Sequence, residues 1–261
     1  TVAAVMQLDS GGHGGNKLPA IGSPCGSVEF KNVSFEYKNA GAEALFDISF
    51  FAKPGQTVGI IGGTGSGKST LVNLVPNFYS ATKGQVLIDG VNADEYDRAA
   101  LLSAVSVVPQ KAVLFEGTIR SNLLMGNPNA SEAELFSALE TAQAAEIVRT
   151  KPNGIDEPVL RGGSNFSGGQ KQRLSIARAL VRGGRILILD DSASALDFAT
   201  DAKLRAAIRK LSPAPTTFIV SQRAASVMFA DFIIVLDDGR AVGQGTHEEL
   251  LRNCAVYREI Y

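Results

Sequence analysis

The sequence lacks the features that define several classes of protein. Tryptophan is absent, aromatic residues make up 7% of the 261 residues, and only two cysteines occur, Cys25 and Cys254. Two cysteines so far apart in sequence match no metal-binding or redox spacing, so we expect reduced thiols in a cytosolic setting. No segment reaches the ~20 consecutive apolar residues of a membrane-spanning helix, and we expect no signal peptide.

An excess of charge of either sign is also missing. Lysine and arginine total 25 and aspartate and glutamate total 26, which gives a formal net charge of −1. This balance argues against broad electrostatic binding of nucleic acid, so we expect no nucleic acid partner. The 45% of hydrophobic residues is typical of a globular protein with a sizeable core.

The order of apolar segments predicts a chain of alternating strands and helices. Residues 1–27 are rich in Gly, Ser and Pro and show no periodicity, so we expect a linker there. Because the sequence begins with Thr1 rather than Met, we expect it to be a fragment of a longer chain. From residue 28 onward, apolar runs that resemble buried strands alternate with amphipathic segments, several with capping-box spacing, such as Ser131 with Glu134 and Thr246 with Glu249. This alternation predicts an α/β fold whose mainly parallel sheet is covered on both faces.

A glycine-rich segment, GGTGSGKS at residues 62–69, fits the pattern G-x-x-x-x-G-K-[ST]. It follows an apolar strand and opens a helix, which is the context of a phosphate-binding loop. Glycines let backbone N–H groups turn onto phosphate oxygens, Lys68 reaches the β- and γ-phosphates, and the Ser69 hydroxyl ligates Mg²⁺. We therefore predict ATP and Mg²⁺ as cofactors, with ATP bound by Gly62, Gly63, Thr64, Gly65, Ser66, Gly67, Lys68, Ser69 and Thr70.

Two adjacent acids, Asp190 and Asp191, end the apolar run of RILILDD. Two carboxylates at the end of a buried strand repel each other, which is costly without a cation or a chemical role. Beside a phosphate-binding loop, Asp190 can hold Mg²⁺ through a water, and Asp191 can orient the water that attacks the γ-phosphate. A pair of solvated acids is the alternative reading.

The segment NFSGGQKQRLSIARAL, residues 165–180, resembles the signature motif of the nucleotide-binding domains of ATP-binding cassette (ABC) transporters. Phe166 stands where Leu is more usual. The glycines at a helix start form a second anion cradle. In this family the cradle grips the γ-phosphate of an ATP held by the partner domain, and here the matching residues are Phe166, Ser167, Gly168, Gly169 and Gln170.

Further matches to the family lie in order between residues 28 and 261. Tyr37 matches the aromatic residue that stacks on adenine, and Gln110 matches the Q-loop residue that contacts Mg²⁺. The stretch LFEGTIRSNLLMG, residues 114–126, is similar to the exporter branch, and the uninterrupted run from Gln110 to the signature argues against chromosome-maintenance relatives. The D-loop at the dimer interface is matched by Ser194, Ala195, Leu196 and Asp197.

The resemblance implies a P-loop NTPase fold of the ABC ATPase type. We expect a mainly parallel core sheet, an antiparallel β subdomain at about residues 28–51 and a helical subdomain at about residues 111–182, within one domain from 28 to 261. The implied function is ATP binding and hydrolysis that powers export across a membrane. The implied partners are a transmembrane domain of the same parent chain and a second ABC half-transporter in a head-to-tail dimer. The implied location is the cytoplasmic face of the plasma (inner) membrane.

Three positions depart from the family pattern. Asp191 stands where Glu is usual, Gln222 replaces the switch His, and Arg161 replaces a Glu in the loop that contacts the membrane domain. Asp is shorter than Glu by one bond of about 1.5 Å, and a misplacement of ~1 Å can cost a catalytic group on the order of 100-fold in rate. Gln222 can hydrogen-bond a phosphate oxygen but cannot carry a positive charge. The role of Arg161 stays open.

Two of these changes, Asp191 and Gln222, fall in one composite site and should preserve ATP binding while weakening hydrolysis. They suggest the degenerate-site subunit of a heterodimeric bacterial exporter, whose intact signature completes the partner's competent site. The alternatives are a conventional homodimeric exporter that tolerates both residues, a nucleotide-binding regulatory module, and a soluble ATPase of translation or DNA repair. For the exporter reading we expect an ATPase whose activity is low in the isolated domain.

Overall fold

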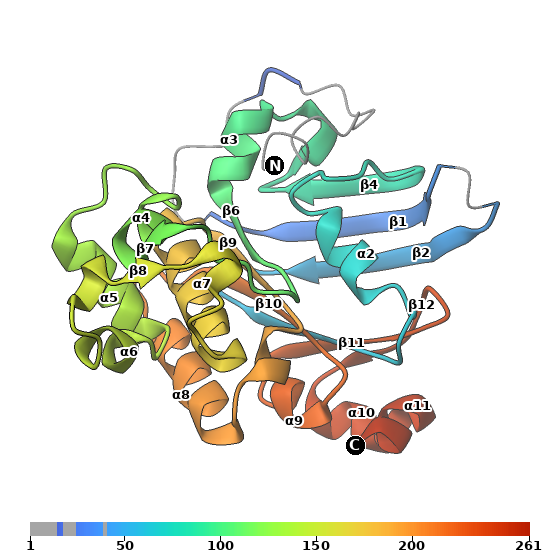
Figure 1. The fold of residues 1–261 in the computed structure, drawn as a ribbon. Helices are drawn as coiled ribbons and strands as arrows, with labels where there is room; N and C mark the ends of the chain where they lie inside the picture. Colours follow the sequence, from blue (N-terminus) through green and yellow to red (C-terminus); the bar gives the residue numbers. More distant parts are fainter. Residues whose placement is uncertain (1–14, 18–24, 39–40) are drawn as a thin grey trace.

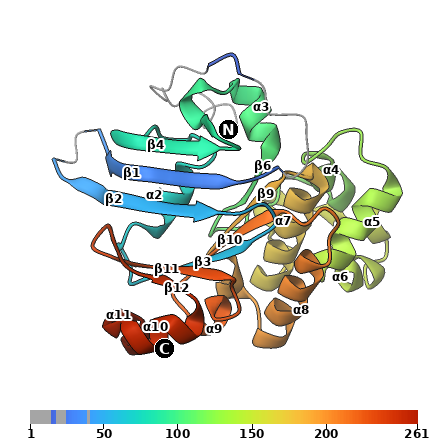
Figure 2. The ribbon, with the colours of Figure 1, turned by 180° about the vertical axis from the view of Figure 1, so that it is seen from behind.

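A computed structural model describes residues 15–17, 25–38 and 41–261. Most of the expected linker at 1–27 therefore lies outside the described residues. The described chain forms two main sheets with helices packed around the larger one (Figures 1 and 2). No helix in this part of the chain is long and apolar enough to cross a membrane.

The larger sheet has six strands in the order β12-β11-β3-β10-β9-β6. All neighbouring strands are parallel except β11 and β12, so the expected mainly parallel core sheet is confirmed. The strands are β3 (Thr57–Ile61), β6 (Val105–Val108), β9 (Ile186–Asp190), β10 (Thr216–Ser221), β11 (Phe232–Asp237) and β12 (Arg240–Gly245).

An antiparallel sheet of four strands in the order β2-β1-β4-β5 lies over one side of the parallel sheet (Figure 1). Its strands are β1 (Val28–Glu36), β2 (Glu43–Ala52), β4 (Lys83–Ile88) and β5 (Val91–Asn92). The antiparallel region therefore extends beyond the expected segment of about 28–51. The later strands join it because β4 pairs with β1 through the register Val28 with Ile88 and Phe30 with Val86.

The helices divide between the two sides of the parallel sheet. Figure 1 shows a group of helices that spans most of the expected helical subdomain, together with a short hairpin of β7 (Gly117–Thr118) and β8 (Pro158–Val159). The helices are α2 (Lys68–Asn73), α3 (Arg98–Ala104), α4 (Ile119–Leu124), α5 (Glu132–Thr141), α6 (Ala145–Arg149), α7 (Gly168–Arg182), α8 (Phe198–Arg209), α9 (Ala224–Val227), α10 (His247–Asn253) and α11 (Ala255–Ile260). Single 3-10 turns lie at 93–95, 154–156, 161–163 and 192–195.

Both faces of the parallel sheet are buried, and each faces its own hydrophobic core. In β10, Phe218 and Val220 point to the core shared with the antiparallel sheet, while Ile219 points to the core shared with the helices. This two-sided burial explains why β3, β9 and β10 read as continuous apolar runs rather than alternating ones. The capping boxes expected at Ser131 and Thr246 are both present.

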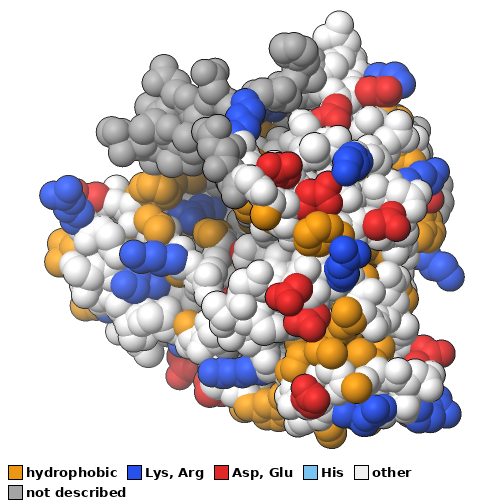
Figure 3. Space-filling model, turned by 90° about the vertical axis from the view of Figure 1, so that its right-hand side faces the viewer, with side chains coloured by type: hydrophobic (Ala, Val, Ile, Leu, Met, Phe, Trp, Pro, Cys, Tyr) orange, Lys and Arg blue, Asp and Glu red, His pale blue; other side chains and the backbone are white. Residues whose placement is uncertain are grey.

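Both cysteines are free thiols, as expected. On the face of the molecule in Figure 3, acidic and basic side chains are interspersed and form no block of one sign. That pattern accords with the near-zero net charge of the sequence.

One carboxylate links the two sheets. Asp89, directly after β4, accepts hydrogen bonds from the N–H groups of Gly26 (2.6 Å) and Ser27 (2.8 Å), just before β1. Its other oxygen lies 3.2 Å from Nη1 of Arg185, just before β9 in the parallel sheet. The Asp89 side chain is 8% exposed, so these partners replace water for a buried charge.

Replacing Asp89 with Ala should lower the free energy of unfolding by about 2–3 kcal/mol, because the N–H groups of Gly26 and Ser27 lose their acceptor and the Arg185 guanidinium loses its partner. Denaturant unfolding of the wild type and of the Asp89→Ala variant measures this change in free energy. Asp237, exposed at the end of β11, supplies the matched control, and its replacement with Ala should change stability by less than about 0.5 kcal/mol. Equal effects at the two positions would contradict the linking role of Asp89.

Candidate active site

Four neighbouring parallel strands end at one edge of the larger sheet. In spatial order they are β3, β10, β9 and β6. The segments that leave their carboxyl ends begin with Gly62, Gln222, Asp191 and Pro109. Because carboxyl ends of adjacent parallel strands meet at the same edge, residues up to 160 positions apart in sequence come together there.

Lys68 is buried within the glycine-rich loop. Its ammonium group donates to the carbonyl oxygens of Gly62 (2.9 Å) and Gly63, and it lies 3.3 Å from Ser66 Oγ. Burial lowers the pKa of Lys68, and the negative charges of Asp191 and Asp190 act in the opposite direction. A buried cation held among loop carbonyls can exchange these partners for phosphate oxygens.

The loop backbone is bare where a phosphate would approach. A Cβ added at Gly63 or Gly65 would meet nothing within 4 Å, whereas one at Gly62 would lie 2.1 Å from the carbonyl oxygen of Leu236. Gly65 and Gly67 have φ values of +82° and +95°, which side chains other than Gly rarely adopt. The loop therefore fits phosphate groups, and glycine is required for both shape and access.

Ser69, directly after Lys68, is hydrogen-bonded to Asp190 at the end of β9. Ser69 Oγ donates to Asp190 Oδ1 at 3.0 Å, across 121 residues of sequence. Burial raises the pKa of Asp190, and the hydrogen bond from Ser69 lowers it. A hydroxyl beside a carboxylate is a donor set suited to Mg²⁺, which prefers oxygen ligands and retains several waters. These two residues therefore fit the expected metal.

Asp191 has an unusual backbone conformation, with φ of +44°. Its N–H donates to the carbonyl oxygen of Val220 in β10 at 3.0 Å, and its own carbonyl oxygen accepts from Ser194 Oγ at 2.8 Å. These bonds hold the residue in the left-handed region, where Asp and Asn are several-fold enriched over other non-glycine residues.

The two glutamines lie on opposite sides of this carboxylate cluster. Gln110 Nε2 donates to Asp191 Oδ2 at 3.0 Å, and Thr64 Oγ1 donates to Gln222 Oε1 at 3.4 Å. The side-chain amide of Gln110 therefore satisfies one oxygen of Asp191, and Gln222 contacts the phosphate loop. All four catalytic residues expected from sequence, Asp191, Gln222, Gln110 and Lys68, lie around the edge of the sheet.

Tyr37, directly after β1, lies beside the loop helix. Its hydroxyl is 2.8 Å from Thr70 Oγ1, and its ring is 36% exposed. It packs edge-on against Phe35 and Tyr79, with ring centroids 4.8 and 5.3 Å away. Tyr79 is 42% exposed and was not singled out from the sequence, because a lone Tyr in a polar segment carries no motif signal.

The signature segment begins helix α7. Ser167 is its N-cap and forms a capping box with Gln170. A Cβ added at Gly168 would meet nothing within 4 Å, so this side of the helix start is open to a ligand. Phe166 is buried, and its ring lies 4.8 Å from the Lys151 ammonium, so its contacts are those of a core residue.

The predicted D-loop packs against the start of α7. A Cβ at Gly169 would lie 3.1 Å from the carbonyl oxygen of Ala195. Leu196 is buried, and Asp197 caps α8 by accepting from the N–H and hydroxyl of Thr200. These bonds lower the pKa of Asp197. Arg161, in the 3-10 turn at 161–163, is exposed.

Comparison with known proteins identifies the family. A family model described as ABC transporter matches residues 45–194. This chain belongs to the ABC transporter family. Its fold is the ABC ATPase domain fold, as predicted, and superposes on a solved bacterial Atm1-family ABC exporter with ATP bound at a TM-score of 0.88 and 36% identity, over 95% of this chain and 44% of that one.

Relatives of similar sequence are ABC transporter proteins, and one of the two described here is named as an export protein. The chain is 46% identical over 246 residues to an uncharacterized ABC transporter ATP-binding protein of Mycobacterium tuberculosis, covering 93% of this chain and 42% of that protein. It is 41% identical over 234 residues to a beta-(1→2)glucan export ATP-binding/permease protein of Bartonella bacilliformis, covering 90% and 39%. The chain thus spans about two fifths of the length of these relatives.

If adenine stacks on Tyr37, replacing Tyr37 with Ala should weaken ATP binding by about 5- to 30-fold, the worth of one aromatic stack. Tyr37→Phe is the matched control, because it keeps the ring and removes only the hydrogen bond to Thr70. Displacement of a fluorescent ATP analogue gives both affinities. Equal losses in the two variants would assign the effect to the hydroxyl and not to stacking.

Proposed function

We propose that this chain is the ATP-binding domain of an ABC exporter and that it binds and hydrolyses ATP to power export of a substrate across a membrane. The observation that carries the proposal is the convergence of the phosphate loop, the Ser69–Asp190 pair, Asp191 and both glutamines at one edge of the sheet. The names of the Bartonella export protein and of the Atm1-family exporter structure support the direction of transport.

Each residue of the site has a defined role in this proposal. Lys68 and the loop N–H groups would hold the phosphates, and Ser69 with Asp190 and Gln110 would hold magnesium, which would neutralise part of the negative charge of the phosphates. Asp191 orients the attacking water, and Gln222 hydrogen-bonds the γ-phosphate. The cradle of Ser167, Gly168 and Gly169 completes the ATP site of a partner domain in a head-to-tail dimer.

The proposed partners are the transmembrane domain of the same parent chain and a second ABC half-transporter. The domain would act at the cytoplasmic face of the plasma membrane. Since Gly168 is open to a ligand, the signature is able to contact a nucleotide supplied by another subunit.

We further propose that the chain's own ATP site is impaired in hydrolysis and that the partner is a different chain. Asp191 already uses one carboxylate oxygen to accept from Gln110, and its side chain is one bond shorter than that of Glu. Gln222 supplies only a neutral amide to the phosphate loop. Binding of ATP needs neither a long acid nor a cation at these positions, whereas water activation and charge stabilisation do.

One observation favours a conventional homodimeric exporter instead. The φ of +44° at Asp191 suits Asp better than Glu, so the backbone alone provides a reason for this substitution. In that case the short acid is a conformational fit, and hydrolysis proceeds with Asp191 as the water-orienting residue.

The double variant Asp191→Glu, Gln222→His separates the two proposals. An impaired site should gain about tenfold or more in ATPase rate, because the longer acid reaches the water and the imidazole can carry charge. The rate should rise more steeply than linearly with protein concentration if a dimer is required. The assay measures phosphate release from the wild type, both single variants and the double variant.

Adding Lys68→Ala to each protein controls for contaminating ATPase, and activity that survives this change is discounted. Substantial wild-type turnover together with no gain in the double variant would contradict the impaired site and support the homodimeric exporter. Absence of ATP binding in the wild type would contradict the proposed function as a whole.

A further inference from the structure

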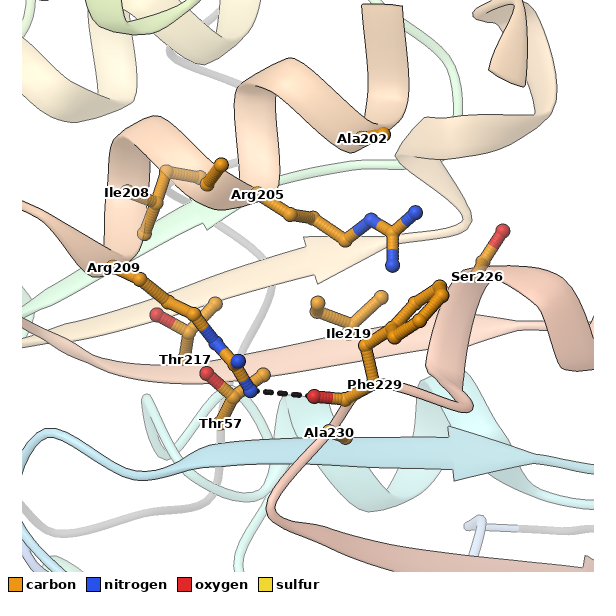
Figure 4. A pocket seen from close by; sticks show the side chains of 11 residues that line it. Thr57, Ala202, Arg205, Ile208, Arg209, Thr217, Ile219, Ser226, Phe229 and Ala230 are labelled. Carbon is orange, nitrogen blue, oxygen red and sulfur yellow. Dashed lines mark hydrogen bonds between the residues drawn. The ribbon is translucent and has the colours of Figure 1, made fainter. Parts of the chain in front are cut away.

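A cavity of about 280 Å³ lies away from the phosphate loop, between α8, α9 and the strands β3 and β10 (Figure 4). Its apolar wall includes Ile208 and Ile219 together with Ala202 and the exposed ring of Phe229. Hydroxyl-bearing residues also line it: Thr57, Thr217 and Ser226. A cavity of this size, mostly apolar with a few polar groups, has the character of a small-molecule site.

The guanidinium of Arg205 extends across this cavity from α8 toward Phe229 (Figure 4). The Arg205 side chain is 11% exposed, and its Nε has no hydrogen-bond acceptor among the described residues. Nη2 lies 3.1 Å from Asp201 Oδ2, so Asp201 already pairs the charge of Arg205. Its central carbon lies 5.2 Å from the centroid of the Phe229 ring. The guanidinium therefore keeps donor capacity, at Nε, that Asp201 does not use.

The second arginine of the cavity, Arg209, is bound to protein groups through Nη2. Arg209 donates to the carbonyl oxygen of Phe229 and lies 3.2 Å from Asp231 Oδ1. It lies at one side of the cavity, where it connects α8 to the segment after α9 (Figure 4). The polar recognition of a ligand therefore falls on Arg205, and the apolar walls take the rest.

We propose that this cavity binds a small amphipathic carboxylate, such as a medium-chain fatty acid, with its carboxylate on Arg205 and its chain against Ile219 and Phe229. A carboxylate accepts a charge-assisted hydrogen bond from Arg205 at the donor that Asp201 does not use. An alkyl chain buries the apolar wall, and the phosphate-loop chemistry is not involved, so this site stands whether or not the proposed function does.

The location gives such a ligand a means to influence hydrolysis. Helix α8 begins directly after the D-loop, β10 ends at Ser221 immediately before Gln222, and α9 begins two residues after Gln222. A ligand bound among these three elements ties together the segments that lead to two parts of the candidate active site.

Octanoate titrated into the ¹⁵N-labelled protein tests the proposal by NMR. An acid of about ten non-hydrogen atoms should bind saturably with a Kd on the order of 1 mM. The largest shifts should fall on amides of residues 202–209 and 226–230. 1-Octanol, with the same chain and no charge, should bind about tenfold more weakly, because it forms no charge-assisted bonds with Arg205.

Variants separate the charge from the shape of the cavity. Arg205→Gln should weaken octanoate binding about tenfold, while Lys203→Gln, an exposed residue of the same helix, should leave it unchanged. Because Arg205→Gln leaves Asp201 buried without its partner, Ala202→Leu provides an independent test: it fills the cavity, keeps the charges and should abolish saturable binding.

Three outcomes would overturn the proposal. The first is equal binding of octanoate and octanol. The second is unchanged octanoate binding in both Arg205→Gln and Ala202→Leu. The third is the absence of saturable octanoate binding to the wild type.

Discussion

The candidate site depends on the parallel alignment of β3, β10, β9 and β6. Neighbouring parallel strands share one direction, so the loops at their carboxyl ends meet without further design. The two-sided burial of the sheet holds this alignment, because a slip of one residue would exchange the side chains of Phe218 and Ile219 between two different cores. The packing of the two hydrophobic cores therefore sets the distances among Lys68, Asp190 and Gln110, although these cores do not line the candidate site.

The same alignment makes a concentrated charge cluster tolerable. Asp190 and Asp191 are adjacent acids at the end of a buried strand, and burial raises the pKa of Asp190. Lys68 lies near enough to both that their charges oppose the fall in its own pKa. Lys68 stabilises the charged form of Asp190, whereas the neighbouring charge of Asp191 opposes it. A bound magnesium ion would add positive charge beside both acids.

Motifs carried most of what the sequence could predict. The parallel sheet, the capping boxes and the phosphate loop all rest on local patterns, and the structure has them. The sequence could not predict the hydrogen bond from Gln110 to Asp191, the contact of Tyr37 with Thr70 or the inclusion of β4 in the antiparallel sheet, because each joins distant segments. Phe166 shows a different limit: its place in a binding motif gave no sign that its ring would be buried in the helical core.

The backbone at Asp191 brings the two views of this site together. A residue held at φ of +44° by bonds to Val220 and Ser194 favours Asp over Glu on conformational grounds. That preference does not extend to Gln222, which follows β10 and is not among the described residues with positive φ. Gln222 is therefore the cleaner probe of an impaired site: a gain of activity from Gln222→His alone cannot be attributed to relief or creation of backbone strain, whereas the effect of Asp191→Glu combines reach with strain. If Asp191 and Gln222 each impair hydrolysis, the imidazole introduced by Gln222→His should restore part of the ATPase rate even though Asp191 is still present.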